Sequence, residues 1–346
     1  MIALWDTTGQ EVVKALAAER RSAGGVTSGL ALTLIAVVDE RHVRDTEQAA
    51  MIAAQQHPCR LIIVVRRNVL DQDSRLDAEI MVGGRLGPCE AVIMRMHGRL
   101  ALHAESVALP LLAPDVPVVT WWHGDPPEKI AYDPLGVVAD RRITDAAQAP
   151  DPDVALKWRA EDYAPGDTDL AWTRLTPWRT TLAGAYDTAD GAAADKVTIK
   201  GDRHDPSVRL LGGWLQARLG VKPTYADGDG KAIASVEVAM ATGGTLSVTA
   251  DDGTAVLSRT GFPDRTMPLL RQPLGEELAE ELRRLDPDEP YAAALSSTTG
   301  IKGLNDRESQ RVHIWHDPAL AEKPEPDEPD TPPPAARRKP AKSAGK

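Results

Sequence analysis

Apolar and polar positions divide the chain into two halves with different periodicities. In the first half, the segments 30–38, 60–65 and 116–122 are almost continuously apolar, as strands covered on both faces usually are. Segments with helical spacing of apolar residues separate them, which favours parallel strands joined by helical crossovers. The expected helices of this half span 8–21, 43–56, 99–112 and 128–135, and its remaining strands span 78–82, 91–96 and 137–143. Residues 1–150 are therefore predicted to form an α/β N-terminal domain with a mixed, partly parallel sheet.

The second half shows the period-two alternation that is typical of half-buried strands. The expected strands span 196–201, 233–240, 245–249 and 255–259, and the expected helices span 206–219 and 274–285. Gly243-Gly244 and Asp252-Gly253 separate consecutive strands, and dipeptides of this kind are strong hairpin signals. Residues 188–316 are therefore predicted to form a smaller α+β domain, in which an antiparallel meander carries helices on one side.

Residues 151–187 connect the two predicted domains. The part 151–166 is polar and contains prolines, as a linker would, whereas 167–187 holds two tryptophans and two arginines. Pro177 fits the first turn of a helix that would run from 177 to about 186. Arginine stacks on aromatic rings and pairs with carboxylates, which suits either an interdomain contact or a partner-binding surface. The candidate residues for such contacts are Trp121, Trp122, His123, Asp169, Trp172, Arg174, Trp178 and Arg179.

The C-terminal residues 317–346 have the composition of a disordered, proline-rich tail. They contain eight prolines and no aromatic residue, and their six acidic residues balance six basic ones. Such a segment cannot bury enough apolar surface to offset its chain entropy. The net charge of −11 therefore belongs to the folded part of the chain, where it argues against binding to nucleic acid or to an anionic membrane surface.

The remaining composition narrows the class of protein further. No apolar run approaches the ~20 residues of a membrane span, and the N-terminus lacks the basic and apolar stretches of a secretory signal. Two cysteines do not make a disulfide framework. We therefore expect a cytoplasmic protein.

The chain offers no convincing catalytic or metal-binding motif. Its eight histidines are scattered, and a glycine-rich phosphate loop ending in Lys-Ser/Thr is missing. His103, Ser106 and Asp115 could supply a nucleophilic triad, but the nucleophile elbow is missing. Because His103 and Ser106 are three residues apart on an expected helix, a hydrogen bond within the helix is the favoured interpretation. We expect no catalytic residue, no cofactor and no metal, and hence no enzyme.

The carboxyl ends of the parallel strands offer an alternative function, the binding of a small ligand. Asp39, Arg66, Arg67 and His123 would meet at this edge, which is where α/β sheets bind ligands. A small-anion or phosphosugar pocket there would make the chain a sensor or an enzyme that uses the crevice near Trp122-His123. The other interpretation is that the paired tryptophans only cover the end of the sheet.

Five stretches of the sequence resemble one protein family. The stretch Asp169-Leu-Ala-Trp-Thr-Arg-Leu-Thr-Pro-Trp-Arg179 is similar to the signature of the OpcA family, the glucose-6-phosphate dehydrogenase assembly proteins of actinobacteria and cyanobacteria. The run Pro117-Val-Val-Thr-Trp-Trp122 is also specific. The supporting stretches lie, in the same order as in the family, at 25–39, 57–63, 103–122 and 211–219. The resemblance covers roughly residues 1–295.

The resemblance implies a non-enzymatic assembly factor and allosteric activator of glucose-6-phosphate dehydrogenase, which would support the oxidative pentose phosphate pathway and the supply of NADPH. The dehydrogenase is the expected partner, and the binding of a small molecule stays open. Cys59 and Cys89 are candidate redox thiols. Cyanobacterial members are linked to redox control through thiols, but these two positions are not matched to those thiols. Both cysteines lie at the start of expected strands of one sheet, and the alternative interpretation is two small buried residues.

Overall fold

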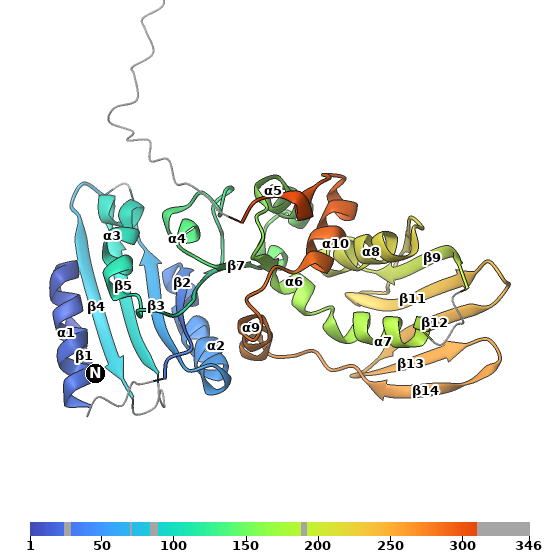
Figure 1. The fold of residues 1–346 in the computed structure, drawn as a ribbon, viewed down its shortest axis with the longest axis horizontal. Helices are drawn as coiled ribbons and strands as arrows, with labels where there is room; N and C mark the ends of the chain where they lie inside the picture. Colours follow the sequence, from blue (N-terminus) through green and yellow to red (C-terminus); the bar gives the residue numbers. More distant parts are fainter. Residues whose placement is uncertain (24–28, 70, 84–88, 188–191, 310–346) are drawn as a thin grey trace, which may run out of the picture. The chain divides into compact units, whose positions relative to one another are not determined.

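The computed structural model describes residues 1–23, 29–69, 71–83, 89–187 and 192–309, whose strands form two β-sheets (Figure 1). The predicted tail at 317–346 lies outside the described residues. Among the helices within the described ranges, none combines the length and the apolar character that crossing a membrane requires.

The first sheet contains eight described strands. They are β1 (Ile2–Leu4), β2 (Leu32–Val38), β3 (Cys59–Arg66), β4 (Arg75–Val82), β5 (Glu90–His97), β6 (Val118–His123), β7 (Arg141–Thr144) and β8 (Asp167–Asp169). Their order across the sheet is β1-β4-β5-β3-β2-β6-β7-β8. From β5 to β8 all neighbours are parallel, whereas β4 is antiparallel to β5 and β1 is antiparallel to β4. The mixed, partly parallel sheet predicted for the first half is thus confirmed.

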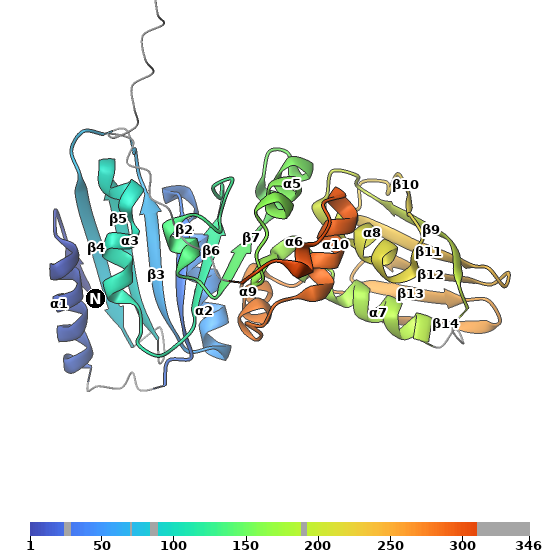
Figure 2. The same ribbon diagram turned by 45° about the horizontal axis from the view of Figure 1, so that its top comes forward.

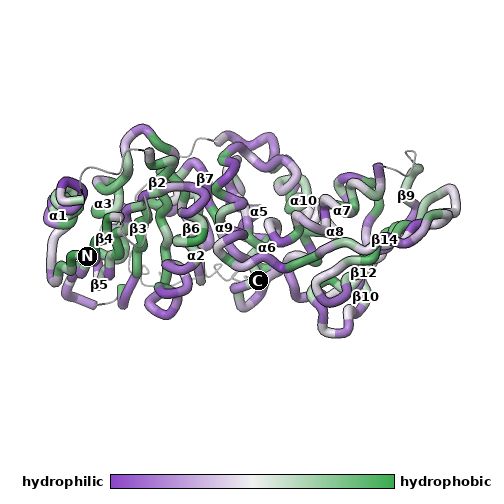
Figure 3. Tube along the Cα trace, turned by 90° about the horizontal axis from the view of Figure 1, so that it is seen from below, coloured by the Kyte–Doolittle hydropathy of each residue, from purple (hydrophilic) through white to green (hydrophobic). Residues whose placement is uncertain are grey.

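Helices cover both faces of this sheet, which explains its unbroken apolar runs. Leu34 and Ala36 of β2 share a core with α2 (Val43–Gln56), and Ile35, between them, shares the opposite core with α1 (Gly9–Ser22). Figure 3 shows hydrophobic residues along the strands of this sheet. A strand that is buried on both faces needs apolar residues at every position, and this is the pattern found in the sequence.

The second sheet contains six described strands and is covered by helices on one face (Figure 2). Its elements are β9 (Ala194–Gly201), β10 (Thr224–Ala226), β11 (Ile233–Met240), β12 (Thr245–Asp251), β13 (Thr254–Arg259) and β14 (Phe262–Pro268), with the helices α7 (Thr176–Asp187), α8 (Pro206–Leu219) and α10 (Glu289–Thr299). The order is β10-β9-β11-β12-β13-β14, in which only the edge strand β10 is parallel to its neighbour. Val236 and Val238 face the helices, whereas Glu237 between them is exposed.

The prediction of one continuous helix over 99–112 is wrong. The chain there forms η3 (Gly98–His103), α3 (Glu105–Ala108) and η4 (Leu109–Leu111). Pro110 explains the break, because proline lacks the N–H for an intrahelical hydrogen bond and its ring clashes with the preceding turn. The helix expected over 128–135 is also wrong, since the helical residues are those of α4 (Pro134–Val137), which begins with a proline in its first turn.

The segment 151–166, predicted as a linker, is largely helical. It contains α5 (Pro152–Asp162), whose N-cap Asp151 accepts a hydrogen bond from the Val154 amide. Leu156 and Ala160 are buried in the core of the second sheet. Because so few apolar residues form the buried face of α5, the sequence there has the polar character of a linker.

The helix expected at 274–285 packs on the first sheet instead of closing the second. It forms α9 (Leu274–Leu282), and its Leu278 belongs to the same core as α2. A Cβ atom at Gly275 would come within 2.5 Å of the Cβ of Ile52 on α2, so this close contact requires glycine. The chain therefore returns from the second sheet to the first at α9, and it goes back to the second at α10.

Candidate functional site at the joint between the two sheets

The joint segment, residues 167–187, is where the chain passes from the core of one sheet to the core of the other. It contains β8, α6 (Leu170–Thr173) and α7, and the helix predicted at 177–186 is confirmed as α7. Leu170 is buried in the core of the first sheet, and Trp172, two residues later, is buried in the core of the second. The joint segment therefore ties the two sheets together by direct packing.

Asp169 fixes the start of α6. Its carboxylate accepts hydrogen bonds from the amides of Ala171 and Ala146 and from the hydroxyl of Thr144, at 2.7–2.9 Å. Burial, and then the negative charge of Asp145, raise the pKa of Asp169 to about 6, although these hydrogen bonds act in the opposite direction. Because the side chain is fully buried, Asp169 acts inside the chain as a helix cap and strand connector.

Arg174 forms a two-sided ionic link across the joint. Its guanidinium donates to both oxygens of Asp145, which follows β7, at 2.7 and 2.8 Å. On its other side it lies 2.9–3.0 Å from the carboxylate of Glu277 on α9. Burial alone would lower the pKa of Arg174, but its bonds to both carboxylates outweigh burial and raise the pKa. One side chain thus connects the joint segment, the first sheet and α9.

A second set of contacts surrounds Trp172. Its indole N–H donates to Asp288 at 2.8 Å, and the guanidinium of Arg179 lies 3.6 Å from the centre of its ring. Close by, Glu281 of α9 forms a buried ion pair with Arg141 of β7. The ring is therefore held by stacking, by a charge-assisted hydrogen bond and by the surrounding core.

The tryptophans predicted as contact residues are interior. Trp121 and Trp122 of β6 lie in the cores on opposite faces of the first sheet, and Trp172 and Trp178 lie in the core of the second sheet. None of the four is more than 7% exposed. In this conformation each of the four side chains packs within the core of one sheet, and a role in interdomain or partner contacts stays a prediction.

The carboxylates that complete the joint were not predicted from the sequence. They are Asp145, Glu277, Glu281 and Asp288. Glu277 and Glu281 lie on an acidic helix that has the appearance of a solvated surface helix. Their spacing of four residues was the available signal, because it places both carboxylates on one face of α9.

The arginines expected at the carboxyl ends of the strands are already paired. Arg66 lies 3.2 Å from the carboxylate of Asp133, and Arg67 lies 2.7 Å from that of Glu40. Both arginines are thus engaged by acidic groups of the same chain, which leaves less of their charge for an incoming anion.

Asp39 and His123 meet at the same edge through His42. The Asp39 carboxylate lies 2.9 Å from Nδ1 of His42, whose ring is edge-on to that of His123 with ring centres 5.0 Å apart. Nδ1 of His123 is 3.1 Å from the side-chain amide of Gln148. Burial, and then the positive charge of His42, lower the pKa of His123, which favours the neutral imidazole. The predicted residues share an edge, but His123 is buried there.

The two cysteines lie close together at the start of β3 and just before β5. The amide of Cys59 donates to Sγ of Cys89 at 3.4 Å, and both are buried free thiols. The hydrogen bond with Cys89, together with burial, raises the pKa of the Cys59 thiol well above its usual value. The geometry fits two small buried residues, and a redox role stays a prediction.

The residues considered for a nucleophilic triad make local contacts. The hydroxyl of Ser106 donates to the backbone carbonyl of His103 at 2.7 Å, and the ring of His103 lies 3.3 Å from the carboxylate of Glu105. Throughout the described ranges, no group of three or more His, Cys, Asp or Glu residues could hold a metal ion.

Comparisons with known proteins place these features in a family. A model described as the glucose-6-phosphate dehydrogenase subunit N-terminal domain matches residues 50–161, and one described as the corresponding C-terminal domain matches residues 165–295. A Synechocystis protein named as the OxPP cycle protein OpcA is 26% identical over a match that covers 48% of this chain. The match spans only 38% of that relative's length. Since both models carry the OpcA name and match in order on either side of residues 162–164, this chain belongs to the OpcA family.

Proposed function

We propose that this chain is a non-enzymatic assembly factor and allosteric activator of glucose-6-phosphate dehydrogenase. The observation that carries the proposal is the ordered match of both family models, each described as part of a glucose-6-phosphate dehydrogenase subunit. The Synechocystis relative is named for the OxPP cycle, which supports a role in the oxidative pentose phosphate pathway and in the supply of NADPH. The chain binds the dehydrogenase and favours its active oligomer.

The contacts at the joint segment support a binding role. Arg174 of the joint segment pairs with buried carboxylates after β7 and on α9, so its charge holds the joint segment against the first sheet. A chain fixed in this way presents surfaces from both sheets in a constant relative position. Such preorganisation lowers the entropy cost of binding a large partner.

Activation requires a difference in affinity between two states of the dehydrogenase. A protein that shifts its partner toward the active oligomer must bind that oligomer more tightly than the inactive form. A tenfold difference in affinity corresponds to about 1.4 kcal/mol. Contacts that form only when dehydrogenase subunits are assembled supply a difference of this kind.

Size-exclusion chromatography of the chain mixed with the dehydrogenase of the same organism tests the proposal. We expect the two proteins to elute together at micromolar concentration and the dehydrogenase to gain specific activity. The variant Lys157→Ala, which loses an exposed ion pair with Glu161, should bind like the unmodified chain. Two separate peaks with unchanged dehydrogenase kinetics would contradict the proposal.

The alternative function, a phosphosugar-binding sensor or enzyme at the crevice near Trp122 and His123, has weaker support. The arginines that would bind the phosphate there, Arg66 and Arg67, already pair with carboxylates. His123 itself is buried. Stabilisation of the chain by a sugar phosphate, abolished by His123→Ala, would favour this alternative.

A further inference from the structure

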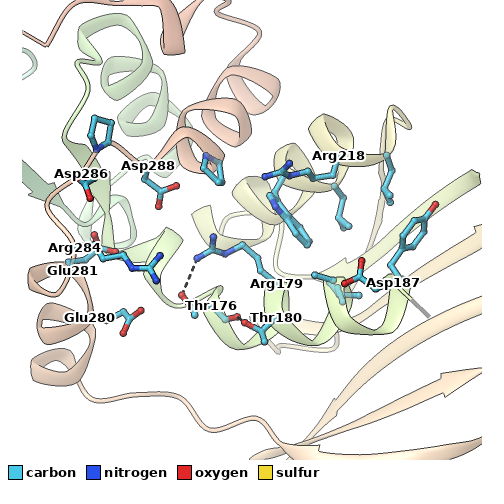
Figure 4. Close-up of a pocket in the computed structure, with 18 of the residues that line it drawn as sticks. Thr176, Arg179, Thr180, Asp187, Arg218, Glu280, Glu281, Arg284, Asp286 and Asp288 are labelled. Atoms are coloured by element: carbon cyan, nitrogen blue, oxygen red, sulfur yellow. Dashed lines mark hydrogen bonds between the residues drawn. The ribbon is translucent and has the colours of Figure 1, made fainter. Parts of the chain in front are cut away.

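A cavity of about 890 Å³ lies beside the joint segment (Figure 4). One wall comes from the end of α9 and from residues 283–290, and α9 packs on α2 of the first sheet. The opposite wall comes from α7, the end of α8, β11 and β12, which belong to the second sheet. Small-ligand sites commonly have volumes of about 300–1,000 Å³ and lie between such structural layers. The size and the position of this cavity are therefore those of a ligand site.

Three arginines of the cavity wall have no carboxylate within ion-pair distance in the part of the chain that the structure describes. They are Arg179 of α7, Arg218 of α8 and Arg284, which follows α9. Two other lining arginines are already paired, Arg141 with Glu281 and Arg283 with Glu280. Because the three unpaired guanidinium groups come from different elements, they would attract an anion in the cavity from several sides.

Arg179 is the least exposed of the three. It donates to the hydroxyl of Thr176 at 3.0 Å, and its Nε is buried without a hydrogen-bond partner among the described residues. Figure 4 shows Arg179 projecting from α7 on the side of Thr176 and Asp288. A partly desolvated cation with an unused donor is unfavourable unless an acceptor reaches it. A bound anion would supply that acceptor.

The same cavity carries acceptors for hydroxyl groups. The side chains of Asp187, at the end of α7, and Asp286, after α9, have no hydrogen-bond partner within the described ranges. Asp288 is less available, because its two oxygens accept bonds from the Trp172 indole and from the Tyr291 amide. Carboxylates of this kind bind the hydroxyls of sugars, whereas guanidinium groups match the geometry of phosphate.

We propose that this cavity binds an organic phosphate that also carries hydroxyl groups, with a size between a sugar phosphate and a nucleotide. The phosphate pairs with Arg179, supported by the rim arginines Arg218 and Arg284, and the hydroxyls donate to Asp187 or Asp286. Since the walls come from both sheets, the ligand contacts both sides of the joint. The site belongs to the isolated chain, so its existence does not depend on the dehydrogenase.

Isothermal titration calorimetry of the full chain tests the site with four probes: glucose 6-phosphate, adenosine 5′-monophosphate, glucose and inorganic phosphate. We expect at least one of the two organic phosphates to bind with a Kd below about 1 mM, and glucose and inorganic phosphate to bind roughly tenfold more weakly or worse. The preference between the two organic phosphates distinguishes a sugar phosphate from a nucleotide.

Two double variants assign the binding to this cavity. The rim variant R218A/R284A removes two exposed arginines of the cavity, and the control R44A/R99A removes two exposed arginines elsewhere. Both have the same net charge, so a general charge effect would weaken binding equally in the two. We expect the rim variant to raise the Kd about tenfold or more and the control to leave it unchanged.

Three results would overturn the proposal. The first is that neither organic phosphate gives heat at about 10 mM, a concentration that would saturate a site with a submillimolar Kd. The rim and control variants could bind equally well, which would place the ligand elsewhere. Equal affinities for glucose and glucose 6-phosphate would show that the arginines do not contribute.

Discussion

Arg174 offers the sharpest test of how the two sheets are held together. Replacing Arg174 by alanine removes the guanidinium that lies between Asp145 and Glu277. The side chains of these two acids are only 2% and 3% exposed. The variant therefore leaves two carboxylates buried next to each other without their shared counter-charge.

The expected loss follows from this burial. Removing one partner of a buried ion pair typically costs about 3–5 kcal/mol. Since the Arg174 side chain is 15% exposed, water screens the pairs only slightly, and we expect the free energy of unfolding to fall by about 3–4 kcal/mol at neutral pH. Burial already raises the pKa of Glu277, and Arg174 opposes that rise. Without Arg174 the carboxyl takes up a proton at higher pH, so the loss should shrink as the pH falls.

Urea unfolding followed by far-UV circular dichroism measures this loss. Lys157→Ala is the control, because the Lys157–Glu161 pair has side chains that are 65% and 53% exposed and should contribute about 0–1 kcal/mol. Combining Arg174→Met with Asp145→Asn and Glu277→Gln should recover part of the loss, since no buried charge then stays unpaired. Equal losses for R174A and K157A would refute the assignment of Arg174 as a structural link.

Three further predictions concern the same region and its surroundings. Trp172→Phe should lower the free energy of unfolding by about 1–3 kcal/mol, because Asp288 loses the indole donor; a neutral result in urea unfolding would argue against this bond. The folded-state pKa of Asp169 is raised from 3.8 to about 6, so its stabilising contribution is complete below the lower value and is lost as the pH rises through the upper one. Asp169→Asn should therefore flatten the stability–pH curve between these values, and an unchanged curve would contradict the pKa. Gly275→Val should cost about 1–3 kcal/mol through its clash with Ile52, and Ile52→Ala should relieve part of that cost; no relief in the double variant would place α9 elsewhere.

Elements whose limits depend on local chemistry could be predicted from the sequence. The helix predicted at 206–219 has these limits in the structure, because Asp205 caps its start and Gly220 ends it with a φ of 71°. The central strands of the first sheet were found because burial on both faces requires unbroken apolar runs. The tryptophans of the joint segment were identified because aromatic residues are few in this chain, and the arginines because they lie beside the tryptophans in the sequence.

Elements that depend on distant partners could not be predicted. Strands β1 and β8 have three residues each and exist because neighbouring strands supply their hydrogen bonds. The packing of α9 on α2 depends on the absence of a side chain at Gly275. The sequence shows the glycine but does not show which distant residue packs against it. Likewise, Glu277 lies 103 residues from its partner Arg174, so no local pattern could reveal that the two side chains form a pair.

The action on glucose-6-phosphate dehydrogenase is the central claim, and light scattering coupled to size exclusion tests it most directly. The molar mass and the specific activity of the dehydrogenase are measured with and without an equimolar amount of this chain. We predict a complex that contains both proteins, a larger share of the assembled dehydrogenase and a higher activity per dehydrogenase subunit. An unchanged mass and activity of the dehydrogenase, or turnover of glucose 6-phosphate by this chain alone, would contradict the claim.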